Sequence, residues 1–276
     1  MTRACVIGWP VAHSRSPDIH RYWLQLYGLD GTYDKEAVPP EEIKGFLRSL
    51  RMRGYAGANV TLPHKEAALH LADHRDEAAT RIGAANTLWL DEDGALQAGN
   101  SDVYGFMTHL AETVPDWNGS ARPVMVLGAG GAARAILYGL IEAGCSQIRI
   151  ANRNSERAEA LAADFAPLEV VRWEERAAAL SGCSLLVNAT SLGMTGKPQL
   201  EIDLSALTPD AVVADIVYNP LETDLLAAAR ARGNAVVDGL GMLLHQAVPG
   251  FERWFGVRPQ VTPELREKIA ATLKEV

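Results

Sequence analysis

A glycine-rich turn between an apolar segment and an amphipathic one is the first candidate for chemistry in this chain. Residues 124–127 form a short apolar run that predicts a strand buried on both faces. Gly128, Gly130 and Gly131 follow at once, and the apolar residues after them recur at helical spacing. Such a turn leaves unpaired backbone N–H groups at a helix N-terminus, where a pyrophosphate can bind. The same glycines would also serve a tight turn without a ligand, and Ala133 replaces the third glycine of the common Gly-x-Gly-x-x-Gly pattern.

Two arginines after the next predicted strand indicate which dinucleotide this turn would bind. Asn152 and Arg153 follow that strand (147–151), where an NAD-binding unit usually has an acidic residue for the ribose 2′-hydroxyl. The chain has no acid there, and Arg153 and Arg157 offer guanidinium groups suited to a 2′-phosphate. The pattern therefore favours NADP(H) over NAD(H), although two solvated surface arginines would leave the same signature.

A lysine at one expected helix start and an aspartate at another are candidates for a functional role. Pro63 opens a helix in which Lys65 lies in the first turn, where the helix dipole disfavours a cation by about 0.3–1 kcal/mol. A flexible, solvated lysine is the alternative interpretation. Asp102 precedes a helix that begins near Val103, so capping that helix is its simplest role. The residues alone leave both roles open.

Alternating apolar strands and amphipathic helices predict an α/β fold. The chain opens with a strand at 3–8, after which Ser16 is a suitable N-cap and Pro17 a suitable first helical residue. The alternation reaches the glycine turn and continues after it. The other expected strands are 32–38, 57–62, 86–90, 95–98, 168–172, 185–187, 211–216 and 235–238. The other expected helices are 41–51, 63–70, 173–180, 221–232, 241–255 and 263–275.

Composition limits the class of protein without naming a substrate. The 276 residues leave room for two domains, and the 48% hydrophobic content suits a soluble globular chain. A formal charge of −8 argues against a broad nucleic-acid or anionic-membrane surface. The sequence shows no signal peptide and no apolar run of about 18 residues, so we expect a cytoplasmic protein.

Neither the cysteines nor the histidines form a metal-binding pattern. Cys5, Cys145 and Cys183 are scattered, with neither a disulfide framework nor metal-ligand spacing. His70 and His74 are four positions apart but have no evident third ligand, so surface histidines are the better interpretation. We therefore expect no metal.

Short motifs in a fixed order run along nearly the whole chain. In the first part they are Gly8-x-Pro10, His13-Ser14-x-Ser16-Pro17, Asn59-Val-Thr61, Pro63-x-Lys65, Gly83-Ala-x-Asn86-Thr87 and Asn100-x-Asp102. In the second part they are Gly128-Ala-Gly-Gly-Ala-Ala133, Asn152-Arg153, Asn188-Ala-Thr-Ser-x-Gly-Met194, Asp215-x-Val-Tyr218-x-Pro220, Gly239 and Gln246-Ala247. In order and spacing these motifs resemble those of the shikimate dehydrogenase family. One departure is Asn154, where the family usually has threonine.

The resemblance implies an enzyme of aromatic amino-acid biosynthesis that reversibly reduces 3-dehydroshikimate to shikimate with NADPH. It implies two α/β domains: a discontinuous substrate-binding domain, residues 1–102 plus 240–276, and a Rossmann-type doubly wound NADP-binding domain, residues 103–239. The last two helices would return to the first domain because Gln246 should reach the substrate. A cleft between such domains is expected to close on the substrate and exclude water.

The resemblance also assigns residues to the site. Lys65 and Asp102 match the catalytic pair: negative charge builds on the carbonyl oxygen as hydride arrives, and Lys65, assisted by Asp102, would donate or accept the proton. The substrate-binding matches are Ser14 and Ser16 for the carboxylate, Asn59, Thr61, Asn86 and Gln246 for the hydroxyls, and Tyr218 at the domain junction. The cofactor-binding matches are Gly128, Ala129, Gly130, Gly131, Ala132, Asn152, Arg153, Arg157, Thr190, Ser191, Met194, Gly239 and Met242.

Two other functions fit much of the same pattern. A quinate/shikimate or aminoshikimate dehydrogenase would carry most of these residues, although the missing acid after the second Rossmann strand disfavours an NAD-linked quinate enzyme. A catalytically silent shikimate-binding regulator would share the scaffold, but it would not need Lys65, Asp102 and Arg153 together. The expected partners are small molecules, with no nucleic acid and no membrane, and monomer and homodimer are equally open.

Overall fold

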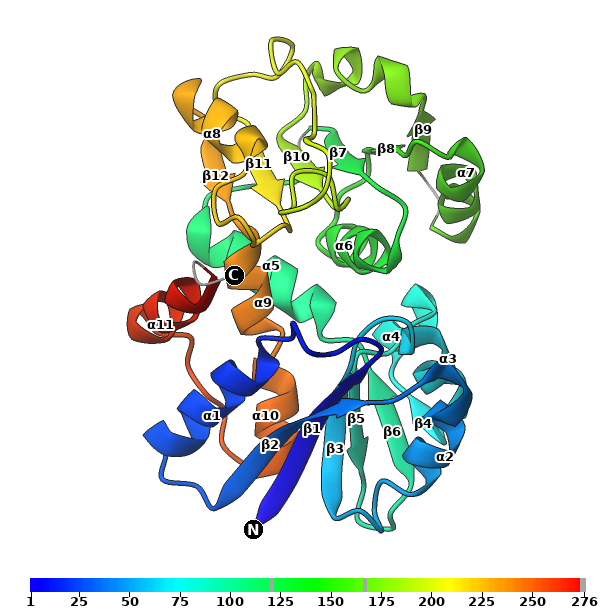
Figure 1. The fold of residues 1–276 in the computed structure, drawn as a ribbon. Helices are drawn as coiled ribbons and strands as arrows, with labels where there is room; N and C mark the ends of the chain where they lie inside the picture. Colours follow the sequence, from blue (N-terminus) through cyan, green and yellow to red (C-terminus); the bar gives the residue numbers. More distant parts are fainter. Residues whose placement is uncertain (120–121, 166–167, 274–276) are drawn as a thin grey trace. The chain divides into compact units, whose positions relative to one another are not determined.

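The computed structural model describes residues 1–119, 122–165 and 168–273. This part of the chain forms two compact units (Figure 1). The first contains Met1–Tyr104 and Leu244–Thr272, and the second contains Gly105–Leu243 and Leu273. The helices α5 (Asp102–Thr113) and α9 (Gly239–His245) carry the chain from one unit to the other.

The first unit is built on a mixed six-stranded sheet. Its strands lie in the order β2 (Gly31–Ala37), β1 (Thr2–Gly8), β3 (Tyr55–Val60), β5 (Thr87–Leu90), β6 (Leu96–Gly99) and β4 (His74–Arg75). β1 pairs in parallel with β2 and β3, whereas β5 runs antiparallel to both β3 and β6. Strand β5 therefore begins, and β6 ends, at the edge of the sheet where β1 and β3 end. This topology brings residues 61–65, 86 and 100–102 to one edge.

Helices cover both faces of this sheet (Figure 1). They are α1 (Ser16–Leu26), α2 (Ile43–Arg48), α3 (Lys65–Leu71), α4 (Glu77–Ile82) and α10 (Val248–Phe255). Helix α11 (Pro263–Leu273) follows α10 and belongs to this unit up to Thr272. Successive side chains of β1 enter two different apolar clusters, as expected for a strand buried on both faces. Val6 packs with Trp254 of α10, and Ile7 packs with Phe46 of α2 and Leu69 of α3.

Several boundaries expected in this unit are wrong. Ser16 is not the N-cap of α1: Arg15 holds that position without a side-chain cap, and Ser16 is the first helical residue. The helix expected at 41–51 is a 3₁₀ turn, η1 (Pro40–Glu42), followed by the short α2. Strand β4 and helix α4 have no counterpart in the sequence analysis. The signal for α4 is Asp76, whose side chain caps the helix by accepting from the backbone N–H of Ala79 at 2.6 Å.

The segment 241–255, expected as one helix, forms two. Helix α9 ends at His245, and α10 begins at Val248. Pro249 explains the break, because it lacks the N–H that a continuous helix would use there but fits the first turn of a new helix. Gln246 therefore lies between two helices rather than within one.

The second unit is built on a six-stranded parallel sheet. Its strands lie in the order β12 (Ala235–Val237), β11 (Val212–Asp215), β10 (Leu185–Asn188), β7 (Val124–Leu127), β8 (Ile148–Ala151) and β9 (Leu168–Val171). The chain starts at β7 and winds outward in both directions, which is the order of a doubly wound Rossmann-type sheet. The predicted fold class is confirmed. Ligands of such sheets bind outside the carboxyl ends of the strands, where the winding reverses between β7 and β10.

Helices and turns also cover this second sheet on both faces. They are α6 (Gly131–Glu142), α7 (Ser155–Asp164), η2 (Trp173–Glu175), η3 (Ala178–Leu180) and α8 (Asp224–Ala231). Val126 of β7 packs with Leu137 of α6, and Leu127 packs on the other face with Leu226 of α8. The helix expected at 173–180 is instead the two 3₁₀ turns. Helix α8 begins at Asp224 rather than 221, because Thr223 caps it.

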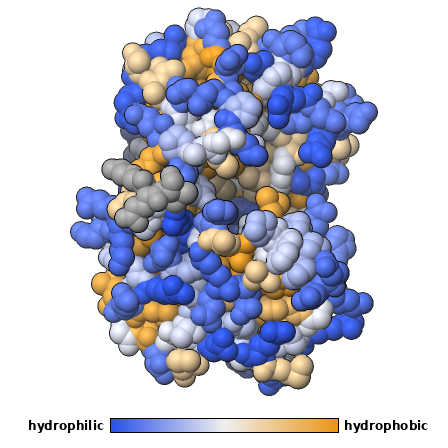
Figure 2. All heavy atoms as spheres, in the orientation of Figure 1, coloured by the Kyte–Doolittle hydropathy of each residue, from blue (hydrophilic) through white to orange (hydrophobic). Residues whose placement is uncertain are grey.

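Most of the surface visible in Figure 2 is hydrophilic, and apolar residues form small, separate patches there. Large apolar side chains are mostly buried in the cores on either side of the two sheets. Within the described residues, no helix combines the length and apolar character needed to cross a bilayer.

Candidate functional site

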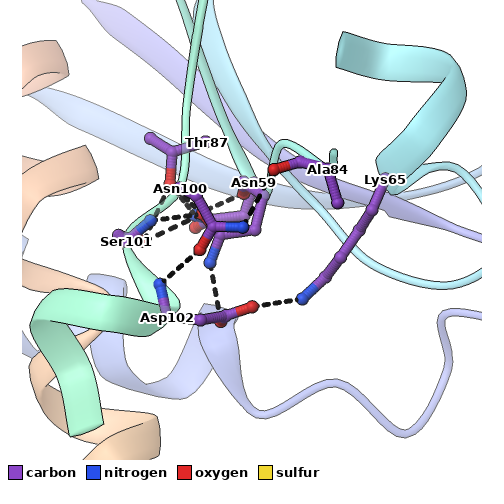
Figure 3. Close-up of polar contacts among 8 residues, drawn as sticks. Asn59, Lys65, Ala84, Thr87, Asn100, Ser101 and Asp102 are labelled. Carbon is purple, nitrogen blue, oxygen red and sulfur yellow. Dashed lines mark hydrogen bonds and ion pairs between the residues drawn. The ribbon is translucent and has the colours of Figure 1, made fainter. Parts of the chain in front are cut away.

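Lys65 and Asp102 form an ion pair at the edge of the first sheet. The Lys65 Nζ lies 2.6 Å from Asp102 Oδ2 (Figure 3). Lys65 is the first residue of α3, which follows β3, and Asp102 is the first residue of α5, which follows β6. Both side chains are mostly buried, with 23% of the lysine and 11% of the aspartate side chain exposed. The pair is therefore shielded but still open to a small ligand.

The backbone of Lys65 is anchored on both sides. Its carbonyl oxygen accepts from the N–H of Ala85 at 2.9 Å. The preceding residue, His64, is buried, and its Nε2 lies 2.7 Å from the carbonyl oxygen of Val38. Because a carbonyl only accepts, Nε2 must carry a proton and donate it. These contacts hold the start of α3 against the ends of β2 and β5.

Asn86 orients the carboxylate of Asp102. Its Nδ2 donates to Asp102 Oδ1 at 2.7 Å, while its Oδ1 accepts from the N–H of Ser101 at 2.7 Å. The hydroxyls of Ser101 and Thr87 also contact Asn86 Oδ1, at 3.1 and 3.0 Å. A side-chain amide surrounded in this way has one favourable orientation, because its NH₂ group could not accept from these donors. At least one amide hydrogen of Asn86 is thus directed at Asp102.

A second amide, Asn59, extends this network to β2. Its Oδ1 accepts from the hydroxyl of Tyr33 at 2.6 Å, and its Nδ2 lies 3.4 Å from the hydroxyl of Thr87. Asn100 completes the network, since its Oδ1 accepts from the N–H of Asp102 and its Nδ2 donates to the carbonyl of Ala84 (Figure 3). Both Asp102 oxygens thus face donors, which suits an ionised carboxylate.

The remaining predicted substrate residues occupy three places. Ser14 and Ser16 lie in the loop after β1 and at the start of α1, and Ser14 Oγ accepts from the N–H of Ser16 at 3.3 Å. Thr61 directly follows β3, and Gln246 precedes α10. These residues belong to the first unit, together with the ion pair. Tyr218, in contrast, belongs to the second unit, in the loop after β11.

The glycine turn of the second unit leaves open space above a helix N-terminus. Gly128 has a φ of +112°, and an added Cβ would lie 2.9 Å from the carbonyl oxygen of Ala189, so the turn itself requires this glycine. Gly130 and Gly131 are exposed, and a Cβ on either would meet nothing within 4 Å. Gly130 is the N-cap of α6. No protein atom fills this space among the described residues, and the free N–H groups there fit a pyrophosphate.

Two exposed arginines follow β8 without acidic partners in the described part of the chain. Arg153 lies in the loop and Arg157 in the first turn of α7. By contrast, Arg134 of α6 is paired with Asp164 at 2.8 Å. Two unpaired guanidinium groups fit a 2′-phosphate. Asn154, the departure from the family pattern, caps α7 by accepting from the N–H of Arg157 at 3.1 Å.

Two of the predicted cofactor residues after β10 and β12 have structural roles of their own. The hydroxyl of Thr190 donates to Asn188 Oδ1 at 2.7 Å and accepts from the N–H of Leu192 at 3.0 Å. Gly239 is needed for packing, because an added Cβ would lie 2.3 Å from the carbonyl oxygen of Ile216. Among the other predicted cofactor residues, Ser191 and Met194 are exposed, and Ala129 and Ala132 of the glycine turn are partly exposed. Asn152 and Met242 are partly exposed.

Sequence reasoning missed three hydroxyl groups of the first site. Thr87 and Ser101 lie within recognised motifs, but the motifs assign them no role. Their adjacency to Asn86 and Asp102 was the available signal. Tyr33 gave no signal, because it reads as an ordinary strand residue. It is fully buried, and burial raises the pKa of its phenol well above the usual value, so it remains a neutral donor. In the described residues, no cluster of three or more His, Cys, Asp or Glu side chains suits a metal.

Comparison with known proteins agrees with this geometry. Residues 6–88 match the shikimate dehydrogenase substrate binding domain, residues 109–196 match shikimate / quinate 5-dehydrogenase, and residues 239–263 match the shikimate 5'-dehydrogenase C-terminal domain. The chain is 58% identical over 264 residues to the shikimate dehydrogenase (NADP(+)) of Paramagnetospirillum magneticum, covering 95% of this chain and 96% of that one. It is 57% identical to the protein of that name from Rhodopseudomonas palustris, covering 98% and 96%.

Solved structures show the same relationship. The shikimate 5-dehydrogenase of Thermus thermophilus, in complex with NADP(H) and shikimate, is 38% identical with a TM-score of 0.86 and covers 99% of this chain and 100% of its own. The quinate dehydrogenase of Corynebacterium glutamicum, in complex with NAD, is 32% identical with a TM-score of 0.91, covering 98% and 99%. The chain belongs to the shikimate dehydrogenase family.

Proposed function

We propose that this protein is an NADP-dependent shikimate dehydrogenase that reversibly reduces 3-dehydroshikimate to shikimate. The observation that carries the proposal is the 2.6 Å contact between Lys65 and Asp102, held in place by Asn86 within a chain of this family. NADPH, when bound, supplies the hydride. Lys65 holds a proton next to an ionised carboxylate, so it is placed to donate that proton to the oxygen that gains charge during reduction.

The neutral polar groups of the first unit would bind and orient the substrate. Ser14 and Ser16 offer hydroxyls for the carboxylate, and neutral donors can orient it without burying a second charge. Asn59, Thr61 and Gln246 offer donors and acceptors for the ring hydroxyls. Asn59 and Asn86 both already take part in the hydrogen-bond network, and the amide of Asn86 is directed at Asp102. Asn86 therefore has a second role. We assign it to hold the catalytic carboxylate and to offer its second amide hydrogen to a substrate hydroxyl.

The second unit would bind NADP. The open N-terminus of α6 would take the pyrophosphate, and Arg153 with Arg157 would take the 2′-phosphate. We therefore assign residues 103–239 to the cofactor, and residues 1–102 with 240–276 to the substrate. The compact units divide the chain close to these positions, at Tyr104 and Leu244, which supports the assignment.

Initial rates with two substrates and two cofactors test the proposal. Shikimate with NADP should give the fastest reduction of the cofactor. NAD should give a much lower rate, because the segment of Arg153 has no acidic residue to accept a hydrogen bond from the ribose 2′-hydroxyl of NAD. Quinate should also give a much lower rate than shikimate. Faster turnover of quinate with NAD would instead identify a quinate dehydrogenase. Shikimate binding without turnover in any combination would identify a regulator. Either result would overturn the proposal.

We also propose a cytoplasmic location and small-molecule partners only. The three cysteines are buried and free, as expected in a reducing compartment. Fractionation of cells that produce the protein tests its location. Light scattering of the purified protein decides between monomer and homodimer.

A further inference from the structure

A buried aspartate joins the ends of two neighbouring strands in the second unit. Asp215 ends β11 and is 2% exposed, and Asn188 ends β10 and is fully buried. The two residues are paired in the register of the parallel strands. They lie at the carboxyl edge of the sheet, where β10 is the neighbour of β7 and β11 is the next strand beyond β10, so Asn188 is one strand and Asp215 two strands from the glycine turn after β7.

Every contact of the Asp215 carboxylate comes from a donor. Asn188 Nδ2 and the N–H of Val217 donate to Oδ1 at 2.9 and 3.0 Å. The hydroxyl of Thr223 donates to Oδ2 at 2.8 Å. An ionised carboxylate accepts all three bonds, whereas a protonated one must turn a donor toward one of them. The loop geometry therefore fits the ionised form.

Asn188 connects the carboxylate of Asp215 to the loop that packs on the glycine turn. Its Nδ2 also donates to the carbonyl of Leu192 at 3.1 Å, and its Oδ1 accepts from the N–H and the hydroxyl of Thr190. All four hydrogen-bonding positions of the amide are thereby used. The loop so held packs on Gly128, whose Cβ position lies 2.9 Å from Ala189 O and 3.1 Å from the methyl group of Thr190.

Val217 connects the same carboxylate to the start of α9. The backbone of Ile216 and Val217 packs on Gly239, where an added Cβ would lie 2.3 Å from Ile216 O and 2.6 Å from Val217 O. One carboxylate thus supports three segments that carry proposed cofactor contacts: the glycine turn, the loop of Thr190, and the start of α9.

We propose that ionised Asp215 is a positioning residue for NADP, and that its protonation loosens these three segments and weakens cofactor binding. The inference rests on the proposed function, because the three segments matter only if this unit binds NADP. Asp215 would not itself touch the cofactor. It acts through Asn188 and Val217.

Burial raises the pKa of Asp215 to about 6, and the bonds from Val217, Thr223 and Asn188 oppose that rise. These three hydrogen-bond donors to the carboxylate are all neutral. The charged residues on the adjoining segments include the exposed Glu222 and Asp224, which flank Thr223, and Asp238 after β12, which lies 3.8 Å from His109. Affinity for NADP should be full above pH 6 and should fall as the pH drops through this value.

The test compares the dissociation constant of NADP between pH 5 and pH 8 for the wild type and Asp215→Asn. The asparagine is the neutral counterpart of protonated aspartate. At pH 8 we expect Asp215→Asn to bind NADP about tenfold more weakly than the wild type. A tenfold difference corresponds to a change of about one unit in the pKa of Asp215 when NADP binds. The 2′-phosphate of NADP itself titrates near pH 6, at about its second pKa. Because both proteins bind the same ligand, this contribution cancels in the ratio of their dissociation constants.

That ratio decides the proposal. It should approach one at pH 5 and rise toward pH 8. A ratio that stays constant across the whole range, whether it equals one or exceeds it, would overturn the inference, since a merely structural residue would leave the pH profile unchanged. Asp203→Asn, an exposed aspartate of the same unit, is the matched control and should keep the ratio near one throughout. Wild-type turnover of shikimate with NADP tests the proposed function separately.

Thr223 provides a second test that does not need a folded Asp215→Asn protein. Thr223→Val removes a donor from Oδ2, which should move the inflection in NADP affinity to higher pH. Thr223→Ser keeps both the donor and the helix cap, so it should restore the wild-type profile. An unchanged inflection in Thr223→Val would also overturn the inference.

Discussion

Asn86 donates to one oxygen of Asp102 at 2.7 Å while Lys65 contacts the other at 2.6 Å. The carboxylate is thus fixed from two sides, and the ammonium of Lys65 is fixed with it. The orientation of Asn86 depends in turn on the hydroxyls of Thr87 and Ser101, which face its carbonyl oxygen. The position of the proposed catalytic pair therefore depends in part on the hydroxyls of Thr87 and Ser101, which contact Asn86 and neither member of the pair.

Removing both hydroxyls should reduce turnover more than the sum of the single changes. Each of Thr87→Val and Ser101→Ala deletes one donor, worth about 1 kcal/mol, and leaves the other to hold the amide of Asn86. The double variant leaves only the backbone N–H of Ser101. We expect each single variant to lower kcat about fivefold, and the pair to show a coupling energy in a double-mutant cycle. Strict additivity would show that the two hydroxyls act independently of each other and do not hold the amide jointly.

Lys65→Ala should lower turnover by about 10²–10⁴-fold with a modest effect on substrate affinity. The variant removes the proton donor but none of the neutral groups proposed to bind the substrate. The measurement is kcat and KM for shikimate at saturating NADP. Lys44→Ala, an exposed lysine on α2, is the matched control and should behave as the wild type. Near wild-type turnover of Lys65→Ala would remove the residue from the mechanism.

Arg153→Ala should weaken the preference for NADP over NAD. A charge-assisted hydrogen bond contributes about 1.5–3 kcal/mol, so we expect the KM for NADP to rise about 10–100-fold while the KM for NAD changes little. Arg134→Ala is the control, because that arginine is already paired with Asp164. Equal increases for both cofactors would mean that Arg153 does not contact the 2′-phosphate.

The fold was largely predictable because apolar runs mark both sheets. The four-residue strands β7, β10 and β11 of the second unit are buried on both faces, and the glycine turn marks the first of them. The predictions failed at positions where a single residue determines the boundary of a helix. Pro249 divides one expected helix, and Thr223 delays the start of another. The short β4 and α4 were not predicted because their two and six residues are too few to show a periodic pattern.

The site was only partly predictable, because its geometry depends on strand register. Lys65 and Asp102 were paired through the family resemblance, and no spacing along the chain would bring them together. Thr87 reaches Ser101 because β5 and β6 pair Thr87 with Gly99. Asp215 reaches Asn188 for the same reason, across β10 and β11. Such contacts join residues far apart in sequence, and a pattern along one strand does not show them.

His20 is a buried histidine, and the unfavourable effect of burial on its protonation is visible only in the structure. It is fully buried in α1, stacked on Tyr33 with ring centroids 3.9 Å apart, and close to Phe251 of α10. Neither ring nitrogen has a hydrogen-bond partner among the described residues. Burial lowers the pKa of His20 to about 3, and the nearby Asn59 opposes this only in part. The folded protein therefore holds a neutral imidazole.

This neutral histidine should make the first unit sensitive to acid. The unfolded chain takes up a proton near pH 6.5 and the folded chain only near 3, so stability present above pH 6.5 is lost as the pH falls toward 3. Between pH 7.5 and pH 5 the loss is about 2 kcal/mol. His20→Phe, which keeps the stacked ring, should remove that loss in urea unfolding measured at the two pH values. The exposed His74→Phe is the control and should keep it. If His20→Phe loses as much stability as the wild type, the acid sensitivity has another source.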